Sequence, residues 1–116
     1  MGLFAHDAYA SAALEIKPVE IAVFNDARVF AMDKSGKYQI GQVGDKWSDV
    51  SDIKNLGLSL LNVAVATKEG MFLIGSESRL DSDKNTYNTA LIVLIDSGNK
   101  NIKQWRHEAN FFEAIQ

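Results

Sequence analysis

The chain contains no cysteine, so disulfide bridges, thiolate metal ligands and cysteine nucleophiles are all excluded. The absence of cysteine is typical of a reducing compartment, and cytoplasmic localisation is therefore favoured, although some periplasmic proteins also lack cysteine. No cross-link is needed for stability, because a domain of 116 residues buries roughly two thirds of the surface that its unfolded chain exposes. We expect one domain over residues 1–116, held together by a hydrophobic core.

Long apolar runs are also missing. The longest, Ala90–Ile95, has six residues, whereas a membrane-spanning helix needs roughly 18 or more. The N-terminal segment Met1–Ile16 lacks a basic region and carries Asp7 and Glu15, which is not typical of a secretory signal. The sequence predicts a soluble chain with no membrane contact.

Charge of one sign is never concentrated. Twelve Lys and Arg residues against fifteen Asp and Glu residues give a net charge of −3, with no block of five or more like charges. The arginines Arg28, Arg79 and Arg106 are spread along the chain, whereas a nucleic-acid-binding surface normally clusters them. We expect no nucleic-acid partner, and the mild acidity favours a basic protein as partner.

The motifs of common enzyme classes are absent as well. The two histidines, His6 and His107, stand at opposite ends of the chain, and no spacing supplies the three protein ligands of a catalytic zinc site. Neither of the glycine-rich phosphate-binding patterns occurs. The sequence therefore predicts a protein that is not an enzyme and that holds no metal or cofactor.

The segments that are present predict a mainly β fold. Residues 7–16 are mostly helix formers with Asp7 as a possible N-cap, and Pro18 ends the short helix that they predict. After the proline, residues 19–24 and 27–32 are rich in apolar and β-branched residues and flank Asn25-Asp26, a pair suited to a tight turn. We expect these two segments to form a hairpin.

An internal similarity is the clearest pattern in the chain. Val29–Gly41 aligns with Val63–Gly75, and each copy predicts a strand, a polar turn, a second strand and a closing glycine. The closing glycines, Gly41 and Gly75, stand 34 residues apart. A residue without a side chain permits a bulge or a close approach of a neighbouring backbone.

Grouping the predicted strands gives an antiparallel meander of about eight strands in two four-strand units, over residues 19–50 and 60–106. Val29–Tyr38 followed by Gly44–Val50 resembles the strand, turn and late tryptophan of β-propeller repeats of the tectonin kind. The resemblance implies blade-like units. Two blades are too few to close a propeller, so such units would have to oligomerise or remain open.

Two predicted strands are apolar without alternation. Met71–Ile74 and Ala90–Ile95 have this character, which indicates central strands covered on both faces. Lys37–Ile40 alternates, as expected of a strand nearer an edge. The second face of the central strands needs a cover, for which we rank the N-terminal helix first, a second sheet next and another chain last.

Asp81–Asn85 has oxygen-bearing side chains at alternate positions, as at the start of a calcium loop. The pattern then fails, because Thr86 replaces the glycine of the sharp turn and Ile92 replaces the closing glutamate. The favoured interpretation is a solvated loop over Glu77–Asn88. Long loops of this kind often carry contact residues, so this one is our first choice for a binding surface.

The aromatic residues near the unit ends allow two interpretations. Trp47 and Trp105 are expected mainly in the core, and exposure as binding anchors is the alternative. In the C-terminal tail 107–116, the pair Phe111-Phe112 either docks on the domain or forms a sticky end for self-association.

The hypothesis that combines these observations is a non-enzymatic protein-binding module, such as a small acidic inhibitor of the immunity-protein type that neutralises a basic partner. The alternative is a homo-oligomeric assembly unit with propeller-like packing. The predicted partner contacts are Asp49, Asp52, Glu77, Arg79, Asp81, Asp83, Trp105, Phe111 and Phe112.

Overall fold

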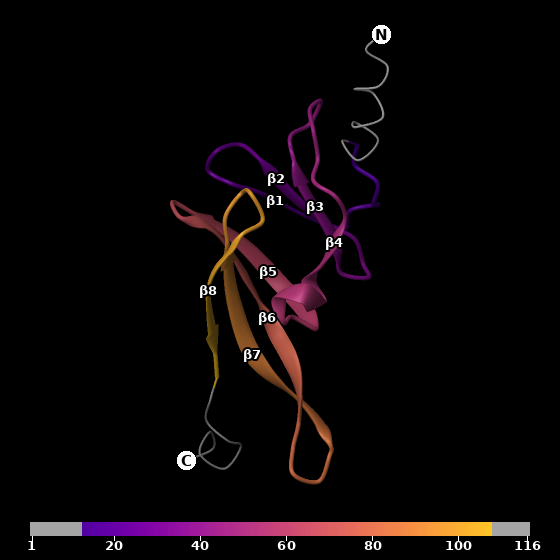
Figure 1. Cartoon of the computed structure of the whole chain (residues 1–116), viewed down its shortest axis with the longest axis vertical. Coiled ribbons are helices and arrows are strands. Elements are labelled where there is room, and N and C mark those ends of the chain that lie inside the picture. Colours follow the sequence, from indigo (N-terminus) through magenta and orange to yellow (C-terminus); the bar gives the residue numbers. More distant parts are fainter. Residues whose placement is uncertain (1–12, 108–116) are drawn as a thin grey trace.

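The computed structural model describes residues 13–107, which form two four-stranded antiparallel sheets (Figure 1). In each sheet the strands lie side by side in chain order. The predicted pair of four-strand antiparallel units is confirmed. Sheet A consists of β1 (Glu20–Val23), β2 (Val29–Met32), β3 (Lys37–Gly41) and β4 (Ser51–Asp52), and sheet B of β5 (Leu60–Thr67), β6 (Gly70–Leu80), β7 (Thr86–Ile95) and β8 (Asn101–Arg106).

The predicted N-terminal helix is wrong for the part of it that is described. Residues 13–16 are irregular, and residues 7–12 lie outside the described range. The backbone around Ala13 and Glu15 bonds to a side chain instead of to a helix: the Glu15 N–H donates to Gln39 Oε1 at 2.7 Å, and Gln39 Nε2 donates to the Ala13 carbonyl at 3.0 Å. Within residues 13–107 the only helical element is the 3-10 turn η2 (Ile53–Leu56), between the sheets.

The same contacts correct the prediction that Lys37–Ile40 lies near an edge. Strand β3 is an inner strand of sheet A, and Tyr38, Gln39 and Ile40 are all buried. The polar side chain of Gln39 predicts an exposed position. In the structure it is buried, and its amide also donates to the Ser48 carbonyl at 2.9 Å. The amide oxygen and nitrogen of Gln39 both have hydrogen-bond partners among residues 13–15 and 48, so burying this side chain costs little free energy.

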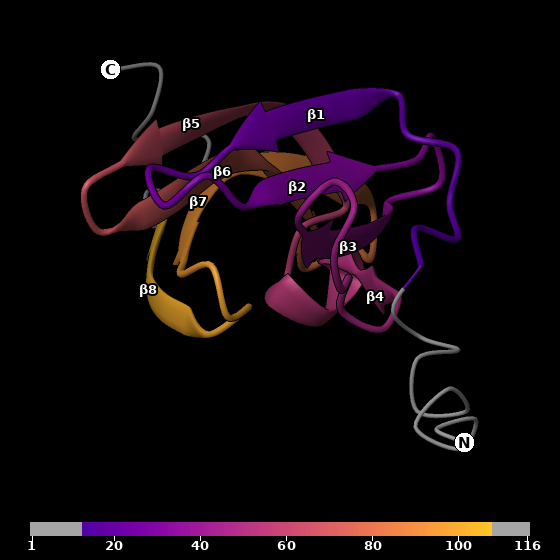
Figure 2. The ribbon, with the colours of Figure 1, turned by 90° about the horizontal axis from the view of Figure 1, so that it is seen from above.

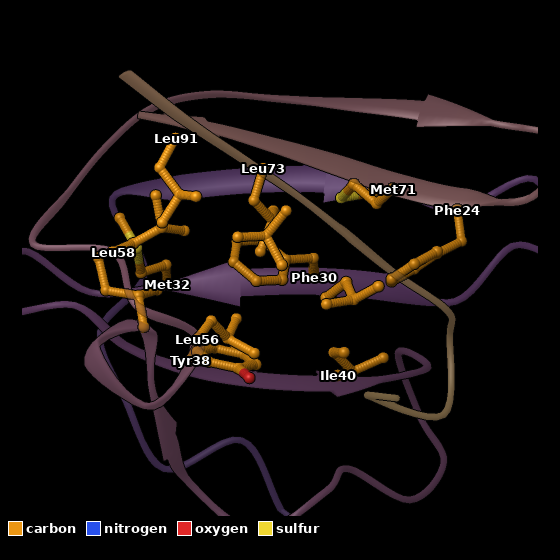
Figure 3. Close-up of a cluster of buried hydrophobic side chains, with 13 residues drawn as sticks. Phe24, Phe30, Met32, Tyr38, Ile40, Leu56, Leu58, Met71, Leu73 and Leu91 are labelled. Carbon is orange, nitrogen blue, oxygen red and sulfur yellow. The ribbon is translucent and has the colours of Figure 1, made fainter. Parts of the chain in front are cut away.

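The hydrophobic core lies between the two sheets. Alternate side chains of β2 and β3 point toward alternate side chains of β6 and β7, and η2 closes one end of the layer (Figure 3). The first strands of the two sheets, β1 and β5, lie side by side (Figure 2). The core residues are Phe24, Phe30, Met32, Tyr38, Ile40, Ile53, Leu56, Leu58, Met71, Leu73, Leu91, Val93 and Ile95.

Four hairpin turns share one construction. Each turn spans five residues, and the fourth of them adopts a positive φ. These residues are Ala27 (74°), Gly36 (91°), Lys84 (65°) and Asn99 (67°). Three of the turns begin with an aspartate whose Oδ1 accepts from the N–H groups two and four residues later. The Asp81–Asn85 pattern is therefore accounted for by the same turn that begins at Asp33 and Asp96.

The two closing glycines of the internal similarity fulfil the predicted role. A Cβ on Gly41 would lie 2.6 Å from Trp47 Cα, and one on Gly75 would lie 1.9 Å from the Leu60 carbonyl oxygen, beside a bulge in β5. The repeated segments occupy different places, however, because one forms β2 and β3 and the other forms β5 and β6. The repeat is thus shifted by one strand relative to the sheets.

The turn between β7 and β8 is bonded to sheet A. The Ser97 hydroxyl donates to Asp26 Oδ2, the Arg28 guanidinium donates to the Ser97 carbonyl at 3.2 Å, and the Tyr38 hydroxyl donates to Asn99 Oδ1 at 2.7 Å. Burial raises the pKa of Tyr38 above its usual value. These hydrogen bonds hold the turn between β7 and β8 against sheet A.

We expect Ser97→Ala to raise the pKa of Asp26. The Ser97 hydroxyl and then the Arg28 N–H hold this pKa below 3.8, so the carboxylate stabilises the fold above about pH 4 and loses that effect as the pH falls through its folded pKa. The variant should lose less stability on acidification. An NMR titration of the carboxyl group checks this. Ser35→Ala is the matched control, because the Ser35 hydroxyl lowers the pKa of Asp33 and not that of Asp26. An unchanged Asp26 pKa in Ser97→Ala would contradict the role given to the Ser97 hydroxyl.

Candidate functional site

The outer face of sheet B, which points away from the core, is apolar across all four strands. Met71, Leu73, Leu91 and Val93 lie in the core, so the alternate residues of β6 and β7 face outward. The registers place these residues beside outward residues of β5 and β8. We call this set the B patch: Val63, Val65, Phe72, Ile74, Ile92 and Trp105.

The B patch is open to solvent. Val63, Val65 and Trp105 are 41, 44 and 40% exposed, and the other three members are half-buried by their neighbours. The rings of Phe72 and Trp105 are in contact, with centroids 5.7 Å apart. The ammonium group of Lys103 lies 5.1 Å from the centroid of Trp105, a cation–π contact at the rim. A hollow lined by Phe72, Ile74, Ile92 and Trp105 occupies the middle.

The outer face of sheet A differs. Over β3 it is covered by residues 13–15, whereas none of the described residues covers β1. Ala22 packs toward the core, so its neighbours face outward, and Val19, Ile21 and Val23 are 66, 60 and 54% exposed. We call these three residues the A stripe. Within residues 13–107, two apolar surfaces are thus left without a cover, one on each sheet.

The predicted loop over Glu77–Asn88 is wrong, because β6 continues to Leu80 and β7 begins at Thr86. The two strands extend as a hairpin beyond sheet A (Figure 1). In this hairpin Glu77 is 9% exposed and binds Arg106 through both carboxylate oxygens, at 2.8 and 3.1 Å. Arg79 lies 3.9 Å from the same carboxylate. Glu77 is therefore paired within the chain.

The remaining predicted contacts do not form one surface. Asp52 caps η2 by accepting from the Lys54 N–H at 2.9 Å and pairs with Lys37 at 3.6 Å. Asp81 holds the turn at the hairpin tip, where Asp83 is exposed, and Asp49 is exposed beside sheet A. Phe111 and Phe112 lie outside the described residues.

The two tryptophans are not core residues. Trp105 belongs to the B patch, and Trp47 is half-buried beside Gly41, with which it forms an isolated bridge. Their places are also not equivalent, because Trp105 lies within a full strand. The expectation of core packing is therefore wrong for both, and Trp105 is the exposed alternative that the sequence also allowed.

Five of the six B-patch residues are missing from the predicted contacts, although a signal for them exists. The unbroken apolar runs Met71–Ile74 and Ala90–Ile95 correctly identify β6 and β7 as the central strands of sheet B. Neither residues 13–16 nor sheet A covers the outer side, and residues 7–12 of the first-ranked cover lie outside the described range.

Among residues 13–107, no three His, Asp or Glu side chains are grouped closely enough to hold a metal ion. In the same range no helix is long and apolar enough to cross a membrane. No protein-family model, curated protein or solved structure matches the chain. Function is therefore inferred from the surfaces of this molecule alone.

Proposed function

We propose that the chain is a non-enzymatic protein-binding module that docks its partner on the B patch. The observation that carries the proposal is a four-strand-wide apolar face with no cover from residues 13–107. Soluble domains rarely leave such a face uncovered, and patches of this kind are typical of interaction sites. Its tryptophan, Trp105 on the edge strand β8, belongs to the residue types that contribute most to binding energy.

The acidic-inhibitor form of the hypothesis has weaker support. Of the predicted acidic contacts, Asp52 and Asp81 cap or close turns and Glu77 is ion-paired. A basic partner would thus meet dispersed carboxylates, some of which already have bonding partners. The B patch is instead continuous and carries no acidic residue. We therefore assign recognition to apolar contact rather than to charge.

A photo-crosslinking amino acid placed at Val65 tests the proposal in an extract of the native source. Val65 is 44% exposed within the B patch, whereas Val43, which is 87% exposed in a loop of sheet A, serves as the matched control position. We expect a discrete protein adduct from position 65 and none from position 43. Adding Ile74→Lys to the position-65 probe should reduce the yield at least tenfold, since the lysine places a charge in the apolar contact.

Circular dichroism of each protein verifies that the sheets remain folded. Equal labelling from positions 65 and 43, or an adduct that survives Ile74→Lys unchanged, would overturn the proposal. The mass of the adduct also distinguishes a second copy of the chain from a different protein.

A further inference from the structure

We infer that the partner supplies an extended segment that adds to the open edge of β8 as a further strand of sheet B, with apolar and acidic side chains on the side of the B patch. This inference rests on the proposed function and names the kind of segment that the same face binds. Three observations carry it: the position of β8 in the sheet, the direction of its backbone groups, and the charge along it.

Strand β8 is the open edge of sheet B. The strand order places β5 and β8 at the two edges of the sheet, and β5 lies beside β1 of sheet A (Figure 2). In the described part of the chain no strand pairs with β8 on the side away from β7, and all six residues of β8 are exposed. The unpaired backbone groups of an edge strand are a template for another strand. Extended peptides bind several kinds of folded domain in this way.

The hydrogen bonds between β7 and β8 show which backbone groups reach this edge. The His107 N–H donates to the Ala90 carbonyl of β7 at 3.2 Å. Because the direction of these groups alternates along a strand, Trp105 and Lys103 also turn theirs toward β7, and Gln104 turns its N–H and C=O toward the open edge. A strand added at this edge would therefore exchange hydrogen bonds with Gln104.

Two side chains of β8 determine what the added strand carries on the side of the B patch. The register places Trp105 opposite Ile92, so Trp105 and Lys103, two residues apart, both lie on the outer face of sheet B. Side chains directly opposite each other on neighbouring strands are in contact. An apolar residue opposite Trp105 would extend the B patch, and an acidic residue opposite Lys103 would pair with its ammonium group. In an antiparallel segment the apolar residue comes first and the acidic residue two positions later.

The charge along β8 favours an acidic segment over a basic one. From residue 100 to residue 107 the chain carries three Lys or Arg side chains and no Asp or Glu, although its net charge is −3. Glu77 pairs with Arg106 on the inner face of the sheet. Of the strand residues that face outward in sheet B, Lys103 alone is charged. Such a charge selects between partners, whereas the apolar contact at Trp105 contributes most of the affinity.

A lysine and a bulge often protect an edge strand from pairing with other chains, and β8 has both. The Lys103 ammonium group, however, lies 5.1 Å from the centroid of Trp105, so it lies over the outer face of the sheet. The bulge lies between Asn101 and Lys103, before the regular part of the strand. Both features therefore leave the backbone of Gln104 accessible.

The test adds two synthetic peptides with blocked ends to the full chain: Thr-Leu-Thr-Glu-Thr-Val, and the same peptide with lysine in place of glutamate. We expect the glutamate peptide to bind at roughly 1 mM or below and to slow hydrogen exchange of the Gln104 N–H severalfold, as measured by NMR. The N–H of Val65, on the other edge of sheet B, is the control and should not change. The lysine peptide should bind about fivefold more weakly, because repulsion replaces an exposed ion pair.

Lys103→Glu should reverse the preference of the chain for the two peptides, since the lysine peptide then meets the opposite charge. Lys34→Glu is the matched control, because it makes the same charge change at an exposed turn position of sheet A. The control should keep the wild-type preference, and added salt should reduce that preference. Circular dichroism verifies that each variant retains its sheets.

Each other result overturns the inference in a distinct way. If the glutamate peptide binds without slowing the exchange of Gln104, it lies on the face of the sheet and not at its edge. If the Gln104 N–H already exchanges slowly without peptide, another part of the chain or a second copy occupies the edge. If both peptides bind equally, or neither binds at up to about 10 mM, the chemistry given to the segment is wrong. None of these results removes the adduct at Val65, so a failure of the proposed function is distinguishable.

Discussion

Gly75→Ala is expected to lower the free energy of unfolding by about 3 kcal/mol or more, because the added carbon has no space. A Cβ at this position would lie 1.9 Å from the Leu60 carbonyl oxygen and 2.9 Å from its carbon. Both atoms belong to the backbone of β5, which cannot yield as a flexible side chain does. The alanine would have to push β5 away from β6 at the bulge. This would also displace the edge of sheet B that lies beside β1.

Gly98→Ala is the matched control for this change. The nearest atom to its added Cβ is the Asp96 Oδ1 at 3.3 Å, which belongs to a side chain that can shift slightly. We expect the control to change stability by less than about 1 kcal/mol. Urea unfolding of both variants and the wild type, followed by circular dichroism, gives the comparison. Equal effects of the two substitutions would contradict the close approach of β5 to β6.

Phe30→Ala is expected to lower the free energy of unfolding by about 3–5 kcal/mol, which is a large part of the stability of a domain of this size. The Phe30 side chain is fully buried between the sheets, with its ring centroid 5.2 Å from that of Tyr38 (Figure 3). Removing the ring leaves a cavity that residues from both sheets would have to fill. Thermal and urea unfolding measure the loss.

Phe72→Ala is the matched comparison, because it removes a phenyl ring from the outer face of sheet B instead of from the core. Phe72 is half-buried on the outer face, where solvent already reaches the B patch. The loss of the Phe72 ring should lower the free energy of unfolding by less than half as much as the loss of the Phe30 ring, as measured by the same unfolding experiments. A cost as large as that of Phe30 would mean that the B patch behaves as core, and it would count against an open docking surface.

Local patterns of the sequence predict much of this fold. The mainly apolar segments on either side of Asn25-Asp26 locate β1 and β2, although the strands are shorter than those segments. Continuous apolar character identifies β6 and β7 as central strands. The aligned glycines Gly41 and Gly75 mark two close approaches of backbone, because each needs a residue without a side chain.

What the sequence could not predict depends on contacts between distant segments. Gln39 is polar and alternates with apolar neighbours, so its burial becomes visible only when residues 13–15 lie across it. The outer halves of β6 and β7 are rich in polar residues because that part of the hairpin extends beyond sheet A and covers no core (Figure 1). Polar composition there is typical of a loop.

The B patch illustrates the same limit. An unbroken apolar strand predicts that both its faces are covered, but the pattern does not say by what, and within residues 13–107 the outer face of β6 and β7 has no cover. Likewise Glu77 and Arg106 are paired across 29 residues of chain, a contact that no spacing rule connects. The sequence shows an apolar pattern for several residues of the candidate site. It does not show that their outer side is open to a partner.

The order of strands within the sheets also has a kinetic consequence. Within each sheet, every strand pairs with its neighbour in the chain, so each sheet is a series of hairpins, and hairpins form on the microsecond scale. Contacts such as Tyr38 with Asn99, 61 residues apart, join the sheets only afterwards. We therefore expect the rate-limiting step of folding to be the docking of the two preformed meanders, at which stage both faces of sheet B are open to a neighbouring chain.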